Sequence, residues 1–349
     1  MSGDNLPTPD FTYPPPYKCV AGLRPYRDGS YRLEPQPQSG RFVVHNYGYG
    51  GAGITLSWGC ASRVREIVSD HLATTADRKI AVLGSGVMGL TAATLLAELE
   101  GITVSIYTQA FWRDTTSAVA GGQWAASKVK YGGKKAEFTK ILETSYNTFK
   151  SSNGFGVSSR PNYTKQPAEN LDTVLQLSPN LIPKPEPLQK MPFEGHNYSG
   201  YKYVTLLIEP PIFLAKLEAD LQARKVPIVK KPFANLADVL SLQERIIVNC
   251  MGLGSKKIWP DPALRPIKGQ LALLRPQPAL QYLYGQDGYM FPRTDAVVIG
   301  GSFEDEFDSP DPDPPFCKLL VDYMKGLFGK GPRIPIPEEH IHNPNNQIA

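Results

Sequence analysis

Residues 79–108, KIAVLGSGVMGLTAATLLAELEGITVSIYT, decide the fold of this chain. Their apolar patterning predicts a strand at 79–83, a helix at 87–100 and a second strand at 103–107. A β-α-β unit of roughly thirty residues, with a glycine turn after its first strand, is typical of dinucleotide binding. The sequence therefore predicts an α/β protein with a Rossmann-like, doubly wound nucleotide-binding domain.

The glycine turn is expected to hold the pyrophosphate of the nucleotide. Gly84 permits the tight turn, Gly86 lets the phosphates approach the backbone, and Gly89 lets the helix pack close to the strand. The phosphates would then sit at the positive N-terminus of the helix. The predicted cofactor-binding residues of this motif are Gly84, Ser85, Gly86, Val87, Met88 and Gly89.

An acidic residue is missing where such a unit usually binds the ribose hydroxyls. The end of the second strand offers Thr108, Gln109 and, further on, Asp114. The glycine turn alone does not separate NAD from FAD. A free NAD would suffer more from this loss than a flavin held along its whole length, so the pattern favours FAD.

Composition narrows the functional class. The net charge of +4 is mild and no Lys/Arg run occurs, which argues against a nucleic-acid partner. The long apolar stretch 80–97 contains three glycines of the turn and is expected to be a buried strand and helix, not a membrane span. The start MSGDNLPTPDF and the end NQIA resemble no targeting signal, so a cytoplasmic location is expected. No metal-ligand cluster is evident. The oligomeric state stays open.

Several separated motifs resemble one family. DTTSAVAGGQW (114–124), VNCMGLGS (248–255), RPIKGQLALLRP (265–276) and GYMFPR (288–293) agree in spacing with the D-amino-acid oxidases, which are FAD-dependent oxidoreductases. The resemblance extends over most of residues 20–328. It implies a flavin-binding domain interleaved with a mixed-sheet substrate domain.

Two motifs of that family stand in an unexpected place. AGLRPYR and HNYGYGGAGITLSWGC (45–60) belong at the C-terminal end of the family, yet here they precede the first strand of the nucleotide unit. The chain therefore looks circularly permuted, with the short polar segment SDHLATTAD (69–77) joining the old ends. Chain ends of this kind usually lie at the surface, so the rearrangement is physically reasonable.

The resemblance, together with the permutation, predicts a division into domains. The flavin domain would comprise 36–112 and 209–263, and the substrate domain 17–35, 113–208 and 264–330. Residues 1–16 would form a proline-rich arm or be disordered, and 331–349 would form a tail. Residues 153–200 match the family poorly and read as a long, proline-broken connection.

The resemblance also implies catalytic roles. Arg24 would bind the substrate carboxylate in bidentate fashion, and Tyr289 would donate to the same group. Tyr284 matches a second pocket tyrosine, although its spacing differs by one residue. The carbonyl of Gly51 would accept from the substrate amine. No histidine stands where a catalytic base would, which suits hydride transfer from a neutral amine.

A further set of residues would surround the flavin. The resemblance places a glycine turn and helix start, a hydroxyl cluster, a strand beside the ring and a backbone contact to the adenine there. These cofactor-binding residues are Gly48, Gly50, Gly53, Ile54, Thr55, Thr115, Thr116, Ser117, Gly122, Gln123 and Phe233.

The implied reaction is FAD-dependent oxidation of an amino-acid C–N bond. A hydride would pass from the α-carbon to flavin N5, giving an imino acid and then a keto acid and ammonia, with dioxygen reoxidising the flavin to give H₂O₂. Ala125 stands where the family often has a pocket glutamine, so other substrates stay open. They are glycine, an N-substituted amino acid, or an acidic D-amino acid paired with Arg293 or Lys202. A non-catalytic flavoprotein is the alternative from another class.

Overall fold

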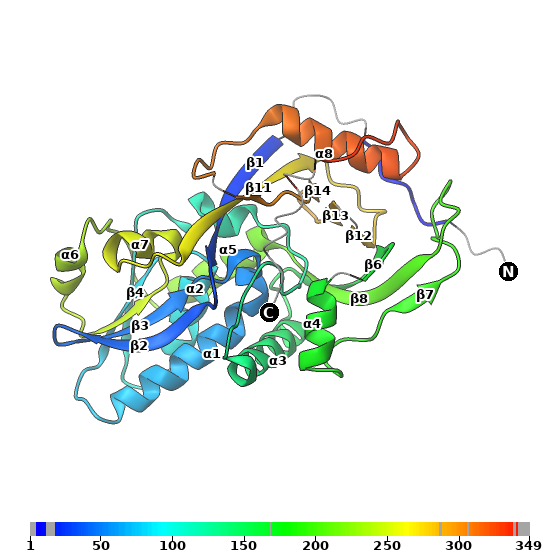
Figure 1. The fold of residues 1–349 in the computed structure, drawn as a ribbon. Coiled ribbons are helices and arrows are strands. Elements are labelled where there is room, and N and C mark those ends of the chain that lie inside the picture. Colours follow the sequence, from blue (N-terminus) through cyan, green and yellow to red (C-terminus); the bar gives the residue numbers. More distant parts are fainter. Residues whose placement is uncertain are drawn as a thin grey trace.

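The chain forms two sheets, which occupy different parts of the ribbon in Figure 1. Residues of both sheets line one cleft. A computed structural model describes residues 5–11, 18–167, 169–285, 288–305, 307–337 and 340. The six-stranded sheet is on the left of Figure 1 and the nine-stranded sheet is at the upper right. The predicted α/β class, with a nucleotide domain and a second mixed-sheet domain, is confirmed.

The six-stranded sheet is a doubly wound parallel sheet with one antiparallel edge strand, in the order β2-β3-β10-β4-β5-β9. Its central strands are almost continuously apolar because helices cover both faces. In chain order the strands are β2 (Arg32–Gln38), β3 (Arg41–Tyr47), β4 (Lys79–Leu83), β5 (Thr103–Thr108), β9 (Ile228–Lys230) and β10 (Ile246–Asn249).

Two helices, α1 and α2, pack on one face of this sheet, and two more pack against them. α1 (Gly53–Leu72) packs against α2 (Val87–Leu96) and α3 (Lys135–Ser151), and α2 also contacts α5 (Pro210–Ala223). The short helices α6 (Leu236–Leu240) and α7 (Ser255–Ile258) lie with the apolar cluster of the other face. The helix expected at 87–100 ends at Leu96 instead, because the chain turns there and reaches β5 through Gly101 at φ +71°.

The nine-stranded sheet is mostly antiparallel, in the order β1-β11-β14-β13-β12-β6-β8-β7, with β15 paired to β11. α8 (Pro314–Leu327) packs on β11 and β14. The strands are β1 (Lys18–Arg27), β6 (Val157–Thr164), β7 (Glu186–Leu188), β8 (Gly200–Ile208), β11 (Leu264–Leu274), β12 (Leu283–Gly285), β13 (Tyr289–Pro292), β14 (Val297–Gly300) and β15 (Glu304–Asp305).

The segment 153–200 is more ordered than the sequence suggested. It supplies β6, β7 and α4 (Glu169–Leu177). Pro161 does not interrupt the sheet on its β12 side, because β12 pairs only with residues 162–164 of β6. The expectation of a long irregular connection was therefore wrong for much of this segment.

The displaced segment 18–72 is built into both sheets. β1 pairs along its whole length with β11, β3 lies between β2 and β10, and α1 packs against α2. β2 belongs to the nucleotide sheet, so the domain boundary expected at 35/36 falls earlier, between Arg27 and Arg32. These contacts are the ones that a circular permutation predicts.

A re-permuted chain tests the order of segments directly. We expect a chain that begins at Lys79, joins residue 337 to residue 5 through a flexible linker and ends at residue 78 to fold and bind its cofactor. The same contacts form in another order, and the loop-closure difference is on the order of 1 kcal/mol. Thermal unfolding and flavin absorbance of the two purified chains provide the comparison. A folded re-permuted chain that has lost only cofactor binding would contradict the prediction.

Both terminal regions contribute to packing where the structure describes them. Phe11 and Ile336 belong to the same buried cluster, with α8 between the sheet and solvent. Leu6 N donates to Pro192 O, and Arg275 forms an ion pair with Asp10. Residues 5–11 and 331–337 are thus ordered extensions of the second domain, and the expectation of a disordered arm was wrong for 5–11. The remaining arm and tail residues, apart from His340, lie outside the described residues.

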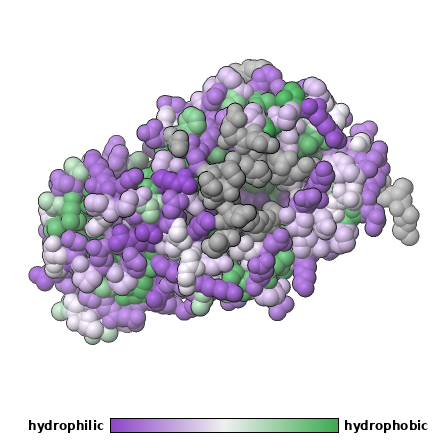
Figure 2. Space-filling view, viewed as in Figure 1, coloured by the Kyte–Doolittle hydropathy of each residue, from purple (hydrophilic) through white to green (hydrophobic). Residues whose placement is uncertain are grey.

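The surface is mixed in character. Apolar residues are scattered among hydrophilic ones on the face shown in Figure 2. Within the described ranges, each helix is too short or too polar to cross a bilayer.

A buried histidine in β3 makes the fold sensitive to acid. His45 Nε2 lies 2.8 Å from Gln36 Oε1, and its Nδ1 lies 3.1 Å from Asn249 Nδ2. A neutral ring satisfies both contacts by donating to Gln36 and accepting from Asn249. Burial, assisted by Arg32, lowers the pKa of His45 to about 3.

We expect the free energy of unfolding to fall as the pH drops below the ordinary histidine pKa of about 6.5. Below that pH the His45 ring of the unfolded chain is protonated, whereas the buried ring of the folded chain stays neutral down to about pH 3. The loss is up to about 1.4 kcal/mol per pH unit. Urea unfolding at pH 7 and pH 5 should show a smaller loss for His45→Gln, which cannot titrate. If the unsubstituted protein and His45→Gln lost the same free energy of unfolding between pH 7 and pH 5, His45 would not be the cause of the acid sensitivity.

Candidate functional site

A cleft of about 1130 Å³ opens between the two sheets. Three loops that follow parallel strands of the six-stranded sheet border it, namely those after β4, β5 and β10. Ligands of doubly wound sheets bind at this edge, outside the carboxyl ends of the strands. The opposite wall is the face of the nine-stranded sheet that carries Arg24 and Tyr289.

The glycine turn after β4 is packed as the sequence predicted. Gly84 has φ +100°, and a Cβ there would lie 2.6 Å from Cys250 O. A Cβ on Gly89 would lie 1.9 Å from Gly84 O, so α2 can approach β4 only with glycine at this position. Gly84, Ser85, Gly86, Val87 and Met88 line the cleft; Gly89 acts from behind it as a packing residue.

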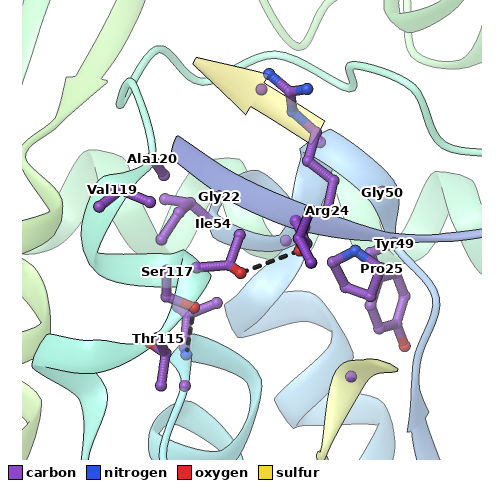
Figure 3. A pocket seen from close by; sticks show the side chains of 18 of the residues that line it. Gly22, Arg24, Pro25, Tyr49, Gly50, Ile54, Thr115, Ser117, Val119 and Ala120 are labelled. Carbon is purple, nitrogen blue, oxygen red and sulfur yellow. Dashed lines mark hydrogen bonds between the residues drawn. The ribbon is translucent and has the colours of Figure 1, made fainter. Parts of the chain in front are cut away.

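A hydroxyl cluster lies beside the N-terminus of α2. Ser117 Oγ accepts from Val87 N at 3.0 Å, and a Cβ on Gly86 would lie 3.2 Å from the same oxygen (Figure 3). Thr116 Oγ1 donates to Leu23 O at 3.0 Å, which ties this segment to β1. Thr115, Thr116 and Ser117 all line the cleft, and their contact with a phosphate stays a prediction.

The far end of the cleft lies against β5. Thr108, Gln109 and Asp114, the three candidates for a ribose contact, all line it, together with Lys231 and Phe233. Phe233 is 9% exposed and packs edge-on against Tyr107 at 6.4 Å between ring centroids. Phe233 thus lies at the end of the cleft where the adenine of the cofactor is expected.

The glycine turn before α1 faces the same cleft. Gly48, Gly50, Gly51, Gly53 and Ile54 line it. Gly50 has φ +52°, and a Cβ there would lie 1.8 Å from Lys128 O. Thr55 was expected to contact the cofactor, but it is buried: its Oγ1 donates to Ala125 O at 2.8 Å and accepts from Ala125 N at 3.0 Å. Thr55 therefore positions the segment that follows Trp124.

The chain just before Trp124 brings Gly122 and Gln123 to the cleft. Ile208 N donates to Gly122 O at 2.7 Å, and Gln123 Nε2 donates to the hydroxyl of Tyr203 at 3.3 Å. Both residues line the cleft between the nucleotide loops and the second sheet, where the side of a bound ring was predicted.

Arg24 and Tyr289 meet on the opposite wall. Arg24 Nη1 donates to Lys268 O and Ser302 O, each at 3.1 Å, and the guanidinium stacks on Phe303 at 4.5 Å. It is also hydrogen-bonded to the Tyr289 side chain. Gly51 lies beside it, since a Cβ there would be 3.6 Å from Arg24 Cδ. Arg24 and Gly51, from the N-terminal part of the chain, thus meet Tyr289, from its C-terminal part, at the cleft.

The surroundings of Arg24 and Tyr289 keep the arginine charged and the tyrosine neutral near pH 7. Burial lowers the pKa of Arg24, and Tyr289 and Glu304 oppose that shift. Arginine stays charged nonetheless, because its pKa starts above 12. Burial raises the pKa of Tyr289 against the opposing effect of Arg24. The site therefore presents a cation and a neutral phenol donor near pH 7.

Tyr284 does not belong to this wall. Gly285 pairs with Tyr289, so Tyr284 points to the other face of the sheet. Its side chain is fully buried in the cluster under α8, and its hydroxyl lies 3.2 Å from that of Tyr198. The prediction of a catalytic role for Tyr284 was wrong because a shift of one residue along a strand reverses the face.

Arg293 and Lys202 also lie away from the cleft lining. Arg293 pairs with Asp295 and donates to Ala120 O, and Lys202 pairs with Glu186. Neither can serve as the extra cation expected for an acidic substrate.

Several lining residues had no signal in the sequence reading. Gly269 leaves room for the guanidinium, because a Cβ there would lie 2.1 Å from Arg24 Nη2. Phe303 supports Arg24, and Asn162 and Tyr203 form the wall beside Gln123. The strand alternation of β6 could have identified Asn162, had residues 157–164 been read as a strand. Among the described residues, no group of three His, Cys, Asp or Glu gathers as metal ligands.

The sequence of this chain is similar to a family model and to several named proteins. Residues 79–342 match the family model named DAO, described as FAD dependent oxidoreductase. A D-amino-acid oxidase of Streptomyces coelicolor is 27% identical over 252 residues, covering 70% of this chain and 76% of its own. A D-amino acid oxidase of Dugesia ryukyuensis is 27% identical over 274 residues, covering 71% and 77%. The matched range begins at β4 and leaves out the displaced segment.

Solved structures show the same fold. The glycine oxidase from Bacillus cereus ATCC 14579 superposes with a TM-score of 0.53 at 16% identity, covering 70% of this chain and 78% of its own. The L-amino acid deaminase from Proteus vulgaris, with its specific insertion deleted, gives 0.53 at 12% identity, covering 73% and 76%.

Proposed function

Because the chain belongs to the DAO family of FAD-dependent oxidoreductases, we propose that it oxidises the C–N bond of an amino acid at its α-carbon. The observation that carries this proposal is the convergence of Arg24, Tyr289 and Gly51 at one end of a cleft whose other end is a dinucleotide site. Relatives named D-amino-acid oxidase support the choice of a D-amino acid.

The residues present fit FAD. The backbone cradle at Gly84 and Gly86 would bind the pyrophosphate at the positive end of α2, with the hydroxyl of Ser117 beside it. Gln109 and Asp114 would bind the ribose hydroxyls. The turn at 48–53 and residues 122–123 would flank the ring. When bound, FAD supplies a two-electron acceptor for the α-hydrogen, and dioxygen is the proposed oxidant of the reduced cofactor.

The protein's own contribution is binding and orientation. Arg24 would pair with the substrate carboxylate, and the protonated hydroxyl of Tyr289 would donate to it. The carbonyl of Gly51, next to Arg24, would accept from the neutral amine. Holding the α-carbon at a fixed distance and angle from the acceptor supplies much of the catalysis.

Anaerobic bleaching tests this function. The purified protein is expected to be yellow and to release FAD, not NAD, on denaturation. Addition of D-amino acids without oxygen should then bleach the absorbance near 450 nm, whereas their L-enantiomers should not. Admission of oxygen should restore the colour and release peroxide. A yellow protein that no amine in the panel bleaches would indicate a flavoprotein without this activity.

A further inference from the structure

The wall next to the proposed substrate site runs across β12, β6 and β8, with polar side chains on β6 and β8. Gly285 pairs with Tyr289 on one side and with Thr164 on the other. Asn162 lies two residues from Thr164 on β6 and pairs with Tyr203 on β8, so these side chains share the face that carries Tyr289. Neighbouring strands are about 4.8 Å apart, which places β6 roughly 10 Å from β13.

The space between Tyr289 and Asn162 is open because residue 285 is glycine. Within the described part of the chain, the nearest atoms to a Cβ built on Gly285 would be Asn162 Oδ1 at 3.8 Å and Nδ2 at 3.9 Å. Gly285, Asn162, Tyr203 and Gln123 all line the cleft. A substrate held by its carboxylate at Tyr289 could therefore extend its side chain over Gly285 towards Asn162.

The far end of this path has one unused acceptor and one unused donor. Asn162 is 2% exposed, and its Oδ1 has no hydrogen-bond partner among the residues that the structure describes. The Tyr203 oxygen accepts from Gln123 and from Asn162. Its hydroxyl hydrogen meets no acceptor in the described ranges, and burial raises the pKa of Tyr203 to about 12, so that hydrogen is retained.

We propose that this wall selects an amino-acid substrate whose side chain ends in a carboxamide, with D-glutamine fitting the path best. The amide N–H would donate to Asn162 Oδ1, and the amide oxygen would accept from the Tyr203 hydroxyl. This pairing requires the orientation of the Asn162 amide in which Oδ1 faces the cleft and Nδ2 faces Tyr203. The inference rests on the proposed oxidation and names its substrate class.

Other side chains leave part of this wall unpaired. A carboxylate carries no N–H and would place negative charge against Asn162 Oδ1, an ammonium carries no acceptor, and an alkyl chain satisfies neither group. A buried polar group left without its partner disfavours binding. Lys165, exposed at the rim and lining the cleft, is the cation that would favour an acid. D-Glutamate is therefore the competing substrate.

The test is the rate of anaerobic flavin bleaching at several concentrations of D-glutamine, D-glutamate, D-methionine and D-alanine. D-Glutamine should exceed D-glutamate and D-methionine by about 10- to 100-fold in the ratio of bleaching rate to apparent Kd. A preference for D-glutamate or D-methionine, or equal values for all, would overturn the inference while leaving the oxidase function intact. If no amino acid bleached the flavin, both the proposed oxidase function and the inferred substrate preference would be wrong.

Variants locate the preference in the wall. Asn162→Leu keeps the approximate volume and should lower the D-glutamine to D-methionine ratio at least 10-fold, with FAD content retained. Tyr203→Phe removes a single oxygen and should lower the same ratio, which keeps the test decisive if the first variant does not fold. Ser158→Ala, on the same face of β6 but outside the cleft lining, should leave the ratio unchanged. If the variants lost FAD but kept the D-glutamine to D-methionine ratio, the wall would contact the cofactor and not the substrate side chain.

Discussion

Replacing Arg24 by leucine should raise KM for a carboxylate substrate by about 30- to 5000-fold, equivalent to roughly 2–5 kcal/mol for the loss of a partly desolvated charged contact. The side chain is held in place by Lys268 O, Ser302 O and the Phe303 ring, so it needs no reorganisation to meet a carboxylate. Steady-state oxygen consumption over a wide substrate range measures the effect.

The FAD content of the Arg24→Leu protein should change little, because the guanidinium of Arg24 is held on the second sheet by Lys268 O and Ser302 O. Arg24→Lys is the matched variant: it keeps the charge but loses the planar fork, so an intermediate KM is expected. Unaltered kinetics in both variants would remove Arg24 from the substrate site. A colourless Arg24→Leu protein would indicate instead that the side chain maintains the cleft itself.

Gly89→Ala should strip the protein of most of its FAD and lower its stability. Alanine is the better helix former, yet its Cβ would lie 1.9 Å from Gly84 O, and both atoms belong to backbone or are attached directly to it. α2 would have to move away from β4, which costs about 1–3 kcal/mol or more and displaces the phosphate cradle. The visible-to-ultraviolet absorbance ratio and the Kd of the apoprotein for FAD report the change.

Gly133→Ala is the control for this substitution. A Cβ on Gly133 would meet no atom within 4 Å, and the residue lies away from the cleft. Its FAD content and thermal midpoint should match those of the unsubstituted protein. If Gly89→Ala also retained its flavin, the close approach of α2 to β4 would not be what shapes the phosphate site.

The nucleotide half of the molecule could be predicted in detail because its signals are local. The strand at 79–83 and its glycine turn need only their own periodicity, and β4 spans those residues. The second half depends on pairing between distant strands, which periodicity does not specify. Asn162 was missed for this reason, and Tyr284 was assigned to the wrong face because the register of its hairpin could not be read.

The early position of residues 18–72 also has a consequence for the growing chain on the ribosome. Val43 of β3 pairs with Ile247 of β10, about 200 residues later in the sequence. The sequence separation between β1 and its partner β11 is larger still. At ~5–20 residues per second, synthesis leaves the apolar β3 without its parallel partner for about 10–40 s. β3 can pair early with β2 on its other edge, and α1 can pack early against α2 and α3. Nascent chains should therefore depend on chaperones that shield exposed strands, and slower translation between residues 72 and 246 should increase aggregation.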